Sequence, residues 1–293
     1  MHMGSISASW KYTDAGVLAV DVVIPETSDL KRAARKFYSM EYSTEVERFE
    51  QLLHELVLVP SVYFFGDAAP IHSAAVATAD GTMLLAGTGG VGKSSAVLAF
   101  RKQKDIGFIA DDISIVSANG QVFGNMAWPK IYGYNCVGNE MARELLRGRS
   151  LADQLHFHVK NRLNPSRVRR KLAPDRLYDS VVPDGKPLNT LFYLFREDVP
   201  NMALTQLPVE SAVEMSIAVM ESEYGVFHRH LNWEEYNSFG GNRTPILTMA
   251  QVRDKWRAIY RSAFSKAEII KVGIPLDIDH ARYQSEIVKI VTR

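Results

Sequence analysis

The stretch 85-LAGTGGVGKSSAVLAF-100 decides how the rest of the chain is interpreted. Residues 87–94 match G-x-x-x-x-G-K-[ST], the pattern of a loop that wraps phosphate groups between a strand and a helix. An apolar run, residues 83–86, precedes the loop, and a helix is expected over residues 94–102. Glycines let successive backbone N–H groups point at phosphate oxygens, and the start of a helix adds a positive dipole end. This stretch therefore predicts a nucleotide-binding P-loop.

The loop residues have separate predicted roles. Lys93 is expected to reach the β- and γ-phosphates, and the Ser94 hydroxyl is expected to ligate Mg²⁺. No N-K-x-D or T-K-x-D follows the loop, so the sequence argues against a guanine-specific GTPase. The predicted nucleotide contacts are Gly87, Gly89, Gly90, Val91, Gly92, Lys93, Ser94 and Ser95.

Two adjacent carboxylates, Asp111 and Asp112, end the apolar run in 106-IGFIADDISIV-116. An acidic residue at the end of a strand beside a P-loop is where Mg²⁺ is expected to be held. Neighbours on a strand point to opposite sides unless the backbone kinks. One carboxylate can therefore face the metal while the other takes the proton of an attacking hydroxyl. The alternative interpretation is a solvated turn between strands.

Two turn signals flank the P-loop helix and bear on the fold. Asp80-Gly81 lies within 72-HSAAVATADGTMLLAG-87, and Asn119-Gly120 separates residues 113–118 from 121–125. Each dipeptide is typical of a tight two-residue hairpin. An ordinary doubly wound domain has crossover helices at these places. We therefore predict an α/β fold with a mixed sheet that has antiparallel pairs on both sides of the P-loop helix.

Residues 1–66 are predicted to form a smaller α+β region ahead of the P-loop domain, residues 67–293. This region should contain a strand over residues 16–24 and a helix from Thr44, with Glu47 completing a capping box. Residues 57–65 are apolar and are expected to form a buried strand that Pro60 interrupts. Further along the chain, helices are expected over 137–148, 209–221, 249–265 and from Asp279, and strands over 188–195 and 268–274.

Composition limits the partners and the compartment. The 34 Lys and Arg residues nearly balance the 33 Asp and Glu residues, which argues against a membrane or nucleic-acid partner unless a local patch binds it. The single cysteine, Cys136, excludes an intrachain disulfide and a cysteine-based zinc cluster. No apolar run is long enough to cross a bilayer. A cytoplasmic protein is therefore expected.

His72, the P-loop and Ala110-Asp111-Asp112 together resemble the HPr kinase/phosphorylase family and its kinase-only relatives, over roughly residues 67–125. The nucleotide-binding core of that family is shared with phosphoenolpyruvate carboxykinases. The resemblance implies a core of this type and ATP as phosphoryl donor. It implies Asp111 as catalytic base with His72 assisting, Ser94 and Asp112 attending Mg²⁺, and Lys93 holding the transferred phosphate. It also implies a homo-oligomer.

Two departures from the family limit what the resemblance implies. The segment 126-MAWPKIYGYN-135 stands where the family has a glycine- and arginine-rich signature, and Ser73 follows His72 where the family has glycine. Reverse phosphorolysis is therefore not expected. We predict a kinase whose acceptor is a hydroxyl of a small metabolite or of a peptide or protein serine. The alternative is a nucleotide-gated binding protein or ATPase that acts on an anionic partner.

Three further features leave alternatives open. The basic segment 160–176 is interpreted as a solvated or mobile surface, a phosphate or substrate contact, or a nucleic-acid contact. His228 and His230 share one face if they lie in a strand, as a metal site would require, but no third ligand is nearby. Trp128 and residues 132–134 line an acceptor pocket or pack in the core.

Overall fold

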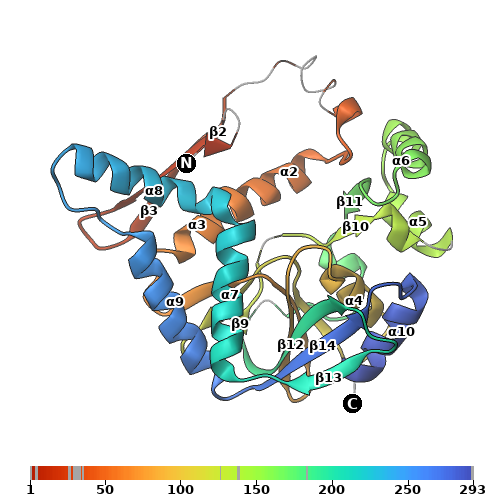
Figure 1. The fold of residues 1–293 in the computed structure, drawn as a ribbon. Coiled ribbons are helices and arrows are strands. Elements are labelled where there is room, and N and C mark those ends of the chain that lie inside the picture. Colours follow the sequence, from red (N-terminus) through yellow and green to blue (C-terminus); the bar gives the residue numbers. More distant parts are fainter. Residues whose placement is uncertain are drawn as a thin grey trace.

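The computed structural model describes residues 2–3, 6–25, 28, 34, 36–125, 127–136, 139–182 and 184–291. Within them lies a nine-stranded sheet with helices on both faces (Figure 1). Its path runs β4 (Ala68–Ile71), β8 (Ser114–Ser117), β9 (Gln121–Phe123), β12 (Lys186–Glu197), β6 (Gly81–Ala86), β5 (Ser73–Thr78) and β7 (Gly107–Ala110). Strand β14 (Glu268–Pro275) also pairs with β12, and β13 (Ala203–Gln206) pairs with β14.

The sheet is mixed, which confirms the prediction from the two hairpins. The long strand β12 is parallel to both β6 and β14, whereas β5 is antiparallel to both β6 and β7. Strands β8 and β9 form the second hairpin, with Gly120 at φ +83° in its turn. In the first hairpin Thr78 pairs with Gly81, so the two turn residues are Ala79 and Asp80, one position earlier than predicted.

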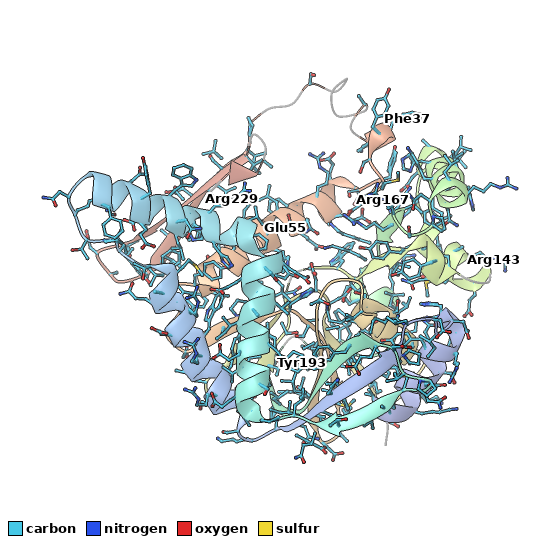
Figure 2. The ribbon with its side chains drawn as sticks, viewed as in Figure 1. Phe37, Glu55, Arg143, Arg167, Tyr193 and Arg229 are labelled. Carbon is cyan, nitrogen blue, oxygen red and sulfur yellow. The ribbon has the colours of Figure 1, made fainter. Side chains whose placement is uncertain are left out.

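Helix α4 (Lys93–Phe100) follows β6 directly through the glycine-rich loop, as predicted. It packs with α10 (His280–Val291) in the hydrophobic cluster on one side of the sheet. On the other side, α7 (Val209–Glu223) and α9 (Met249–Phe264) bury Trp256 and Tyr260 in a second cluster. Tyr193 of β12, labelled in Figure 2, donates its hydroxyl to the Ala212 carbonyl of α7. The predicted helices and strands of this part of the chain are confirmed, and α9 begins with a Thr248–Gln251 capping box.

The N-terminal region has a three-stranded antiparallel sheet of β1 (His2–Met3), β2 (Ile6–Tyr12) and β3 (Leu18–Val23). Helix α2 (Glu45–Leu52) begins with the predicted Thr44–Glu47 capping box. The prediction of a strand over residues 57–65 is wrong. A π-helix (Leu53–Leu58) continues α2 and leads into α3 (Val59–Val62), and Pro60 lies just after the junction of the two. A continuous apolar run does not distinguish a buried helix from a buried strand.

A small lobe formed by residues 130–136 and 139–171 contains most of the basic segment, residues 160–176. Strands β10 (Lys130–Tyr132) and β11 (Arg169–Lys171) form a two-stranded sheet beside α5 (Asn139–Leu146) and α6 (Leu151–Leu163). The expected helix over 137–148 is present from residue 139, and residues 137–138 lie outside the described part. Helix α6 was not predicted. Its N-cap, Ser150, accepts a hydrogen bond from the Asp153 N–H.

Much of the basic segment has a structural role. Arg170 is fully buried and donates from Nε to Asp153 Oδ1 at 2.6 Å, while Arg149 donates to the other Asp153 oxygen at 2.9 Å. Lys171 is also buried, and its Nζ lies 3.1 Å from Glu41 Oε1. Exposed Arg167, beside this lobe in Figure 2, belongs to the loop between α6 and β11. Among the described residues, no helix is both long and apolar enough to cross a membrane.

Candidate active site

A cavity of about 650 Å³ opens where β6 runs into the loop and α4. It collects side chains and loop backbone from distant parts of the chain. Its walls comprise His72, Gly89, Gly90, Gly92, Lys93, Ser94, Ser95, Asp111, Asp112, Lys130, Tyr132, Tyr134, Ser166, Arg196, Glu223, Tyr224, His280 and Tyr283. All three residues predicted as catalytic and both predicted metal ligands line this one cavity.

The glycine-rich loop has the backbone that its sequence predicts. Gly87, Gly90 and Gly92 have φ values of +140°, +78° and +117°, which favour glycine. Gly92 also needs a bare Cα, because an added Cβ would lie 2.7 Å from the Tyr283 hydroxyl oxygen. Buried Val91 packs beneath Gly87. Most of the loop therefore follows from local sequence and from two close contacts, of Gly92 with α10 and of Gly87 with the backbone of Leu194.

Lys93 is folded back onto its own loop. Its Nζ donates to the carbonyls of Gly87 and Thr88, both at 2.8 Å. Burial lowers the pKa of Lys93 to about 8, against the opposing pull of nearby carboxylates that include Glu223. Ser95 of the same helix donates to Asn135 Oδ1 at 3.2 Å and is buried. Lys93 donates to two carbonyl oxygens, and phosphate oxygens could take their place as acceptors. Ser95 donates to a side chain instead.

Asp111 and Asp112 face different partners because the backbone kinks between them. Asp112 has φ +76°, a left-handed conformation that few residues other than Gly, Asn and Asp adopt readily. Asp111 is buried and accepts from the Ser94 hydroxyl at 2.8 Å and from the Asp112 N–H at 3.0 Å. Burial first, and the Asp112 charge second, raise the pKa of Asp111. The structure therefore brings Asp111, rather than Asp112, to Ser94.

Asp112 lies at the centre of a separate polar group. Its Oδ2 is 3.0 Å from Lys130 Nζ, and its Oδ1 accepts from the Tyr224 hydroxyl at 2.8 Å. His72 Nε2 lies 3.8 Å from Asp112 Oδ1. Burial alone would raise the pKa of Asp112, but Lys130, His72 and the Tyr224 hydrogen bond outweigh it and hold that pKa well below its usual range.

His72 connects this polar group to the glycine-rich loop. Burial, and secondarily the Lys93 charge, lower the pKa of His72 to about 3, so the imidazole is neutral near pH 7. Its Nδ1 lies 3.0 Å from Glu223 Oε2, although the two are not aligned as a hydrogen bond. The other oxygen of Glu223 accepts from the Gly89 N–H at 2.6 Å. The side chains predicted from the loop and the strands thus meet a carboxylate from α7.

Sequence reasoning missed Lys130, Glu223 and Tyr224 as site residues. Lys130 stands within the segment noted only as a departure from the family, and the other two lie at the corner where α7 ends and α8 (Gly225–Gly240) begins. Gly225 after a long amphipathic helix was the available signal for that corner. Nothing local indicated that the corner returns to the phosphate loop, 134 residues away along the chain.

One wall of the cavity is aromatic. Tyr132 and Tyr134 stack with ring centroids 5.5 Å apart, and His280 meets the Tyr134 ring edge-to-face at the same separation. Arg196 lies over the Tyr283 ring, 5.5 Å from its centroid. Such flat surfaces suit a nucleobase or ribose. Tyr132 and Tyr134 line this cavity, whereas Trp128 does not, and the expectation that these residues line an acceptor pocket stays a prediction.

A second cavity, of about 530 Å³, meets the first at Lys130, which lines both. Its walls come from β2, α2, the π-helix and β11, and α2 crosses between β2 and β11 in Figure 1. Arg169 and Lys171 line one side. Glu55 of the π-helix, labelled in Figure 2, lines the cavity as well, and burial raises its pKa.

His228 and His230 lie in helix α8 rather than in a strand, so they do not share a face in the way that a strand would require. His228 Nδ1 is 2.8 Å from the Tyr63 hydroxyl, and His230 stacks on the Tyr63 ring. Both therefore pack structurally. The described residues contain no cluster of three or more His, Cys, Asp or Glu side chains arranged for a metal ion.

Comparison of the chain with family models gives no match, and comparison with curated protein sequences gives none.

Proposed function

We propose that the protein is a Mg²⁺- and ATP-dependent kinase that transfers the γ-phosphoryl group to a hydroxyl. The observation that carries the proposal is the convergence of a glycine-rich loop, Lys93 and two differently partnered aspartates on one cavity. In the reaction, the acceptor oxygen forms a bond to the γ-phosphorus and the bond to the β–γ bridging oxygen breaks. ADP leaves, and the hydroxyl proton passes to a carboxylate.

The residues present fit a magnesium ion that is held together with a nucleotide. Mg²⁺ is usually bound by one or two protein oxygens plus phosphates and waters, rather than by a dedicated cage. Ser94 Oγ and Asp111 Oδ1, 2.8 Å apart at the start of α4, offer such a pair. When bound, the ion neutralises charge that develops on the phosphates. We assign Ser94 and Asp111 as the residues that would hold it.

The contacts favour Asp112 as the carboxylate that receives the acceptor proton, which exchanges the roles implied by the family resemblance. Asp112 adjoins His72 and Lys130, and Lys130 is the side chain shared by the two cavities. Its pKa is low while Lys130 is its partner, which makes it a weak base, so it would orient the hydroxyl and take the proton late, once bond formation to phosphorus has made the hydroxyl acidic. His72, neutral beside it, assists in that orientation.

The second cavity supports an acceptor site beside the phosphates. Its volume lies within the range of about 300–1,000 Å³ that is typical of small-molecule sites. It adjoins Asp112 through Lys130, and it offers both Arg169 and the carboxyl of Glu55 for recognition. A hydroxyl-bearing small molecule and a serine side chain of a peptide can both use such a site.

The test is transfer of γ-labelled phosphate from ATP into a cell extract that is separated into small-molecule and macromolecular fractions. We expect label in one fraction with the wild-type protein. Asp112→Asn, which tolerates the left-handed backbone, should bind Mg-ATP and transfer nothing. Asp111→Asn should lose the Mg²⁺-dependent part of nucleotide binding.

Transfer that survives Asp112→Asn but not Asp111→Asn, with nucleotide binding intact in both, would restore Asp111 as the base. Label found solely as free phosphate, unchanged by either substitution, would overturn the kinase and favour a nucleotide-gated binding protein.

A further inference from the structure

The carboxylate of Glu223 occupies the anion-binding side of the phosphate loop. The backbone N–H of Gly89 donates to Glu223 Oε1 at 2.6 Å, the distance of a charge-assisted hydrogen bond. A Cβ placed on Gly89 would lie 3.2 Å from the other carboxylate oxygen, so the loop backbone and the side chain are in close contact. Backbone N–H groups of such loops are the donors that hold phosphate oxygens. Here one of those donors already has an anionic partner from the same chain.

The second oxygen of Glu223 identifies which part of the phosphate site is filled. Oε2 lies 3.0 Å from Nδ1 of buried His72, and the opposite nitrogen of that ring faces Asp112 at 3.8 Å. Nδ1 has no aligned hydrogen-bond partner among the described residues. Glu223 therefore lies between the loop and the side chains proposed to receive the acceptor. That is the transfer end of the cavity, where the terminal phosphate of a nucleotide belongs.

We propose that Glu223 is an internal competitor for the terminal-phosphate position and that its displacement distinguishes a triphosphate from a diphosphate. The inference rests on the proposed nucleotide site. A terminal phosphate that accepts from the Gly89 N–H takes the place of Glu223 Oε1, and like charges so close together repel. A diphosphate held by Lys93 and Ser94 leaves Glu223 where it is.

Displacement needs only a side-chain rotation. The Glu223 side chain is 29% exposed, so its carboxylate can move into solvent while α7 stays in place. His72 Nδ1 can then donate to a phosphate oxygen in the tautomer that carries the single N–H of the neutral ring on Nδ1. Binding of the triphosphate would in this way exchange one anion on His72 for another, next to Asp112.

The test is equilibrium binding of Mg-ATP and Mg-ADP to the wild-type protein, Glu223→Ala and Glu221→Ala, measured by titration calorimetry. Glu221 is the matched control: it lies two residues earlier on α7, carries the same charge, and accepts from Arg253 Nε at 2.7 Å. If Glu223 fills the loop in about nine of ten molecules, its removal lowers the apparent Kd for ATP about tenfold. We expect the Kd for ADP to change by less than about twofold, and the control to shift both ligands slightly and equally.

Three results would overturn the inference. The ATP affinity of Glu223→Ala could equal that of Glu221→Ala, it could fall below the wild-type value, or ATP and ADP could gain equally. An equal gain for ATP and ADP would mean that the loss of one negative charge, and not a vacated phosphate position, explains the higher affinity.

Phosphoryl transfer is read separately from binding. A selective gain for ATP without label transfer would defeat the kinase proposal and leave this inference standing. Label transfer without a selective gain in ATP affinity for Glu223→Ala would defeat this inference and leave the kinase proposal standing. If no variant binds a nucleotide, both proposals are defeated.

Discussion

Replacing Lys130 by methionine keeps the length of the side chain and removes its charge from Asp112. The two groups lie 3.0 Å apart, with 20% and 30% of their side chains exposed. Removing one member of a buried ion pair costs about 3–5 kcal/mol, because the other charge is left without compensation. Asp112 keeps the Tyr224 hydrogen bond and is not fully buried, so we expect a loss of about 2–3 kcal/mol in the free energy of unfolding.

That loss corresponds to a fall in Tm of roughly 3–5 °C, because a chain of 293 residues unfolds with an entropy of about 0.6 kcal/mol/K. The matched control is Lys102→Met, which breaks an exposed pair: Lys102 Nζ lies 3.5 Å from Glu140 Oε2, and the side chains are 61% and 81% exposed. Exposed pairs contribute about 0–1 kcal/mol. Urea unfolding of the two variants and the wild type at pH 7 measures the difference directly.

The pH dependence of the Lys130→Met variant gives a second, independent readout. In the wild type the pKa of Asp112 is held low, so its contribution to stability is present above the ordinary carboxyl range and is lost only as pH falls through the lowered value. Without Lys130, burial dominates and raises that pKa. The folded variant then takes up a proton more readily than the unfolded chain, so its deficit narrows between pH 7 and pH 5. A deficit no larger than that of Lys102→Met, or one that grows as pH falls, refutes the reasoning.

Three other substitutions test separate parts of the structure by urea unfolding. Gly92→Ala should lower the free energy of unfolding by about 2–4 kcal/mol, because φ +117° is strained for alanine and the new Cβ meets the Tyr283 hydroxyl. The control Gly225→Ala has open space around its Cα and should be nearly neutral. Equal losses in the two variants would contradict the close contact. Asp153→Asn should lower the free energy of unfolding by about 3–5 kcal/mol, because it leaves fully buried Arg170 without its charge partner. A loss below about 1 kcal/mol would show that the ion pair does not stabilise the fold. Burial lowers the pKa of His54 to about 4, so its stabilising contribution is present above about pH 6.5 and is lost as pH falls toward 4. The free energy of unfolding of His54→Leu should therefore depend less steeply on pH over that window. The same steepness in the variant and the wild type would argue against burial as the cause.

Local signals predicted much of the fold. Asn119-Gly120 gave a hairpin with a positive-φ glycine, and Thr44 with Glu47 gave a helix start, because turn and cap geometry depends on a few adjacent residues. The apolar run 57–65 carried no periodicity and was misread as a strand. Helix α6 was overlooked although Ser150 and Asp153 provided a cap signal at its start.

The site was predictable to the extent that it is local. Residues 72–112 carry the loop, His72 and both aspartates, and the antiparallel pairing of β5 with β6 and with β7 folds that stretch onto itself. Tyr224 reaches Asp112 across 112 residues of sequence, and no motif announces that contact. The division of partners between Asp111 and Asp112 depends on one left-handed residue, which a strand pattern does not reveal.

The position of β12 in the sheet has a consequence for how the protein is made. The strand that leads into the phosphate loop, β6, pairs with β5 at once, but its other neighbour is β12, which begins about a hundred residues later. Ribosomes add roughly 5–20 residues per second, so β6 waits on the order of 5–20 s for that edge to be covered. During this interval the nascent chain already carries the whole glycine-rich motif. Gly87, which must fit against the backbone of Leu194, cannot yet adopt its final contact, so the glycine-rich loop is completed only after the middle of the sheet has been synthesised.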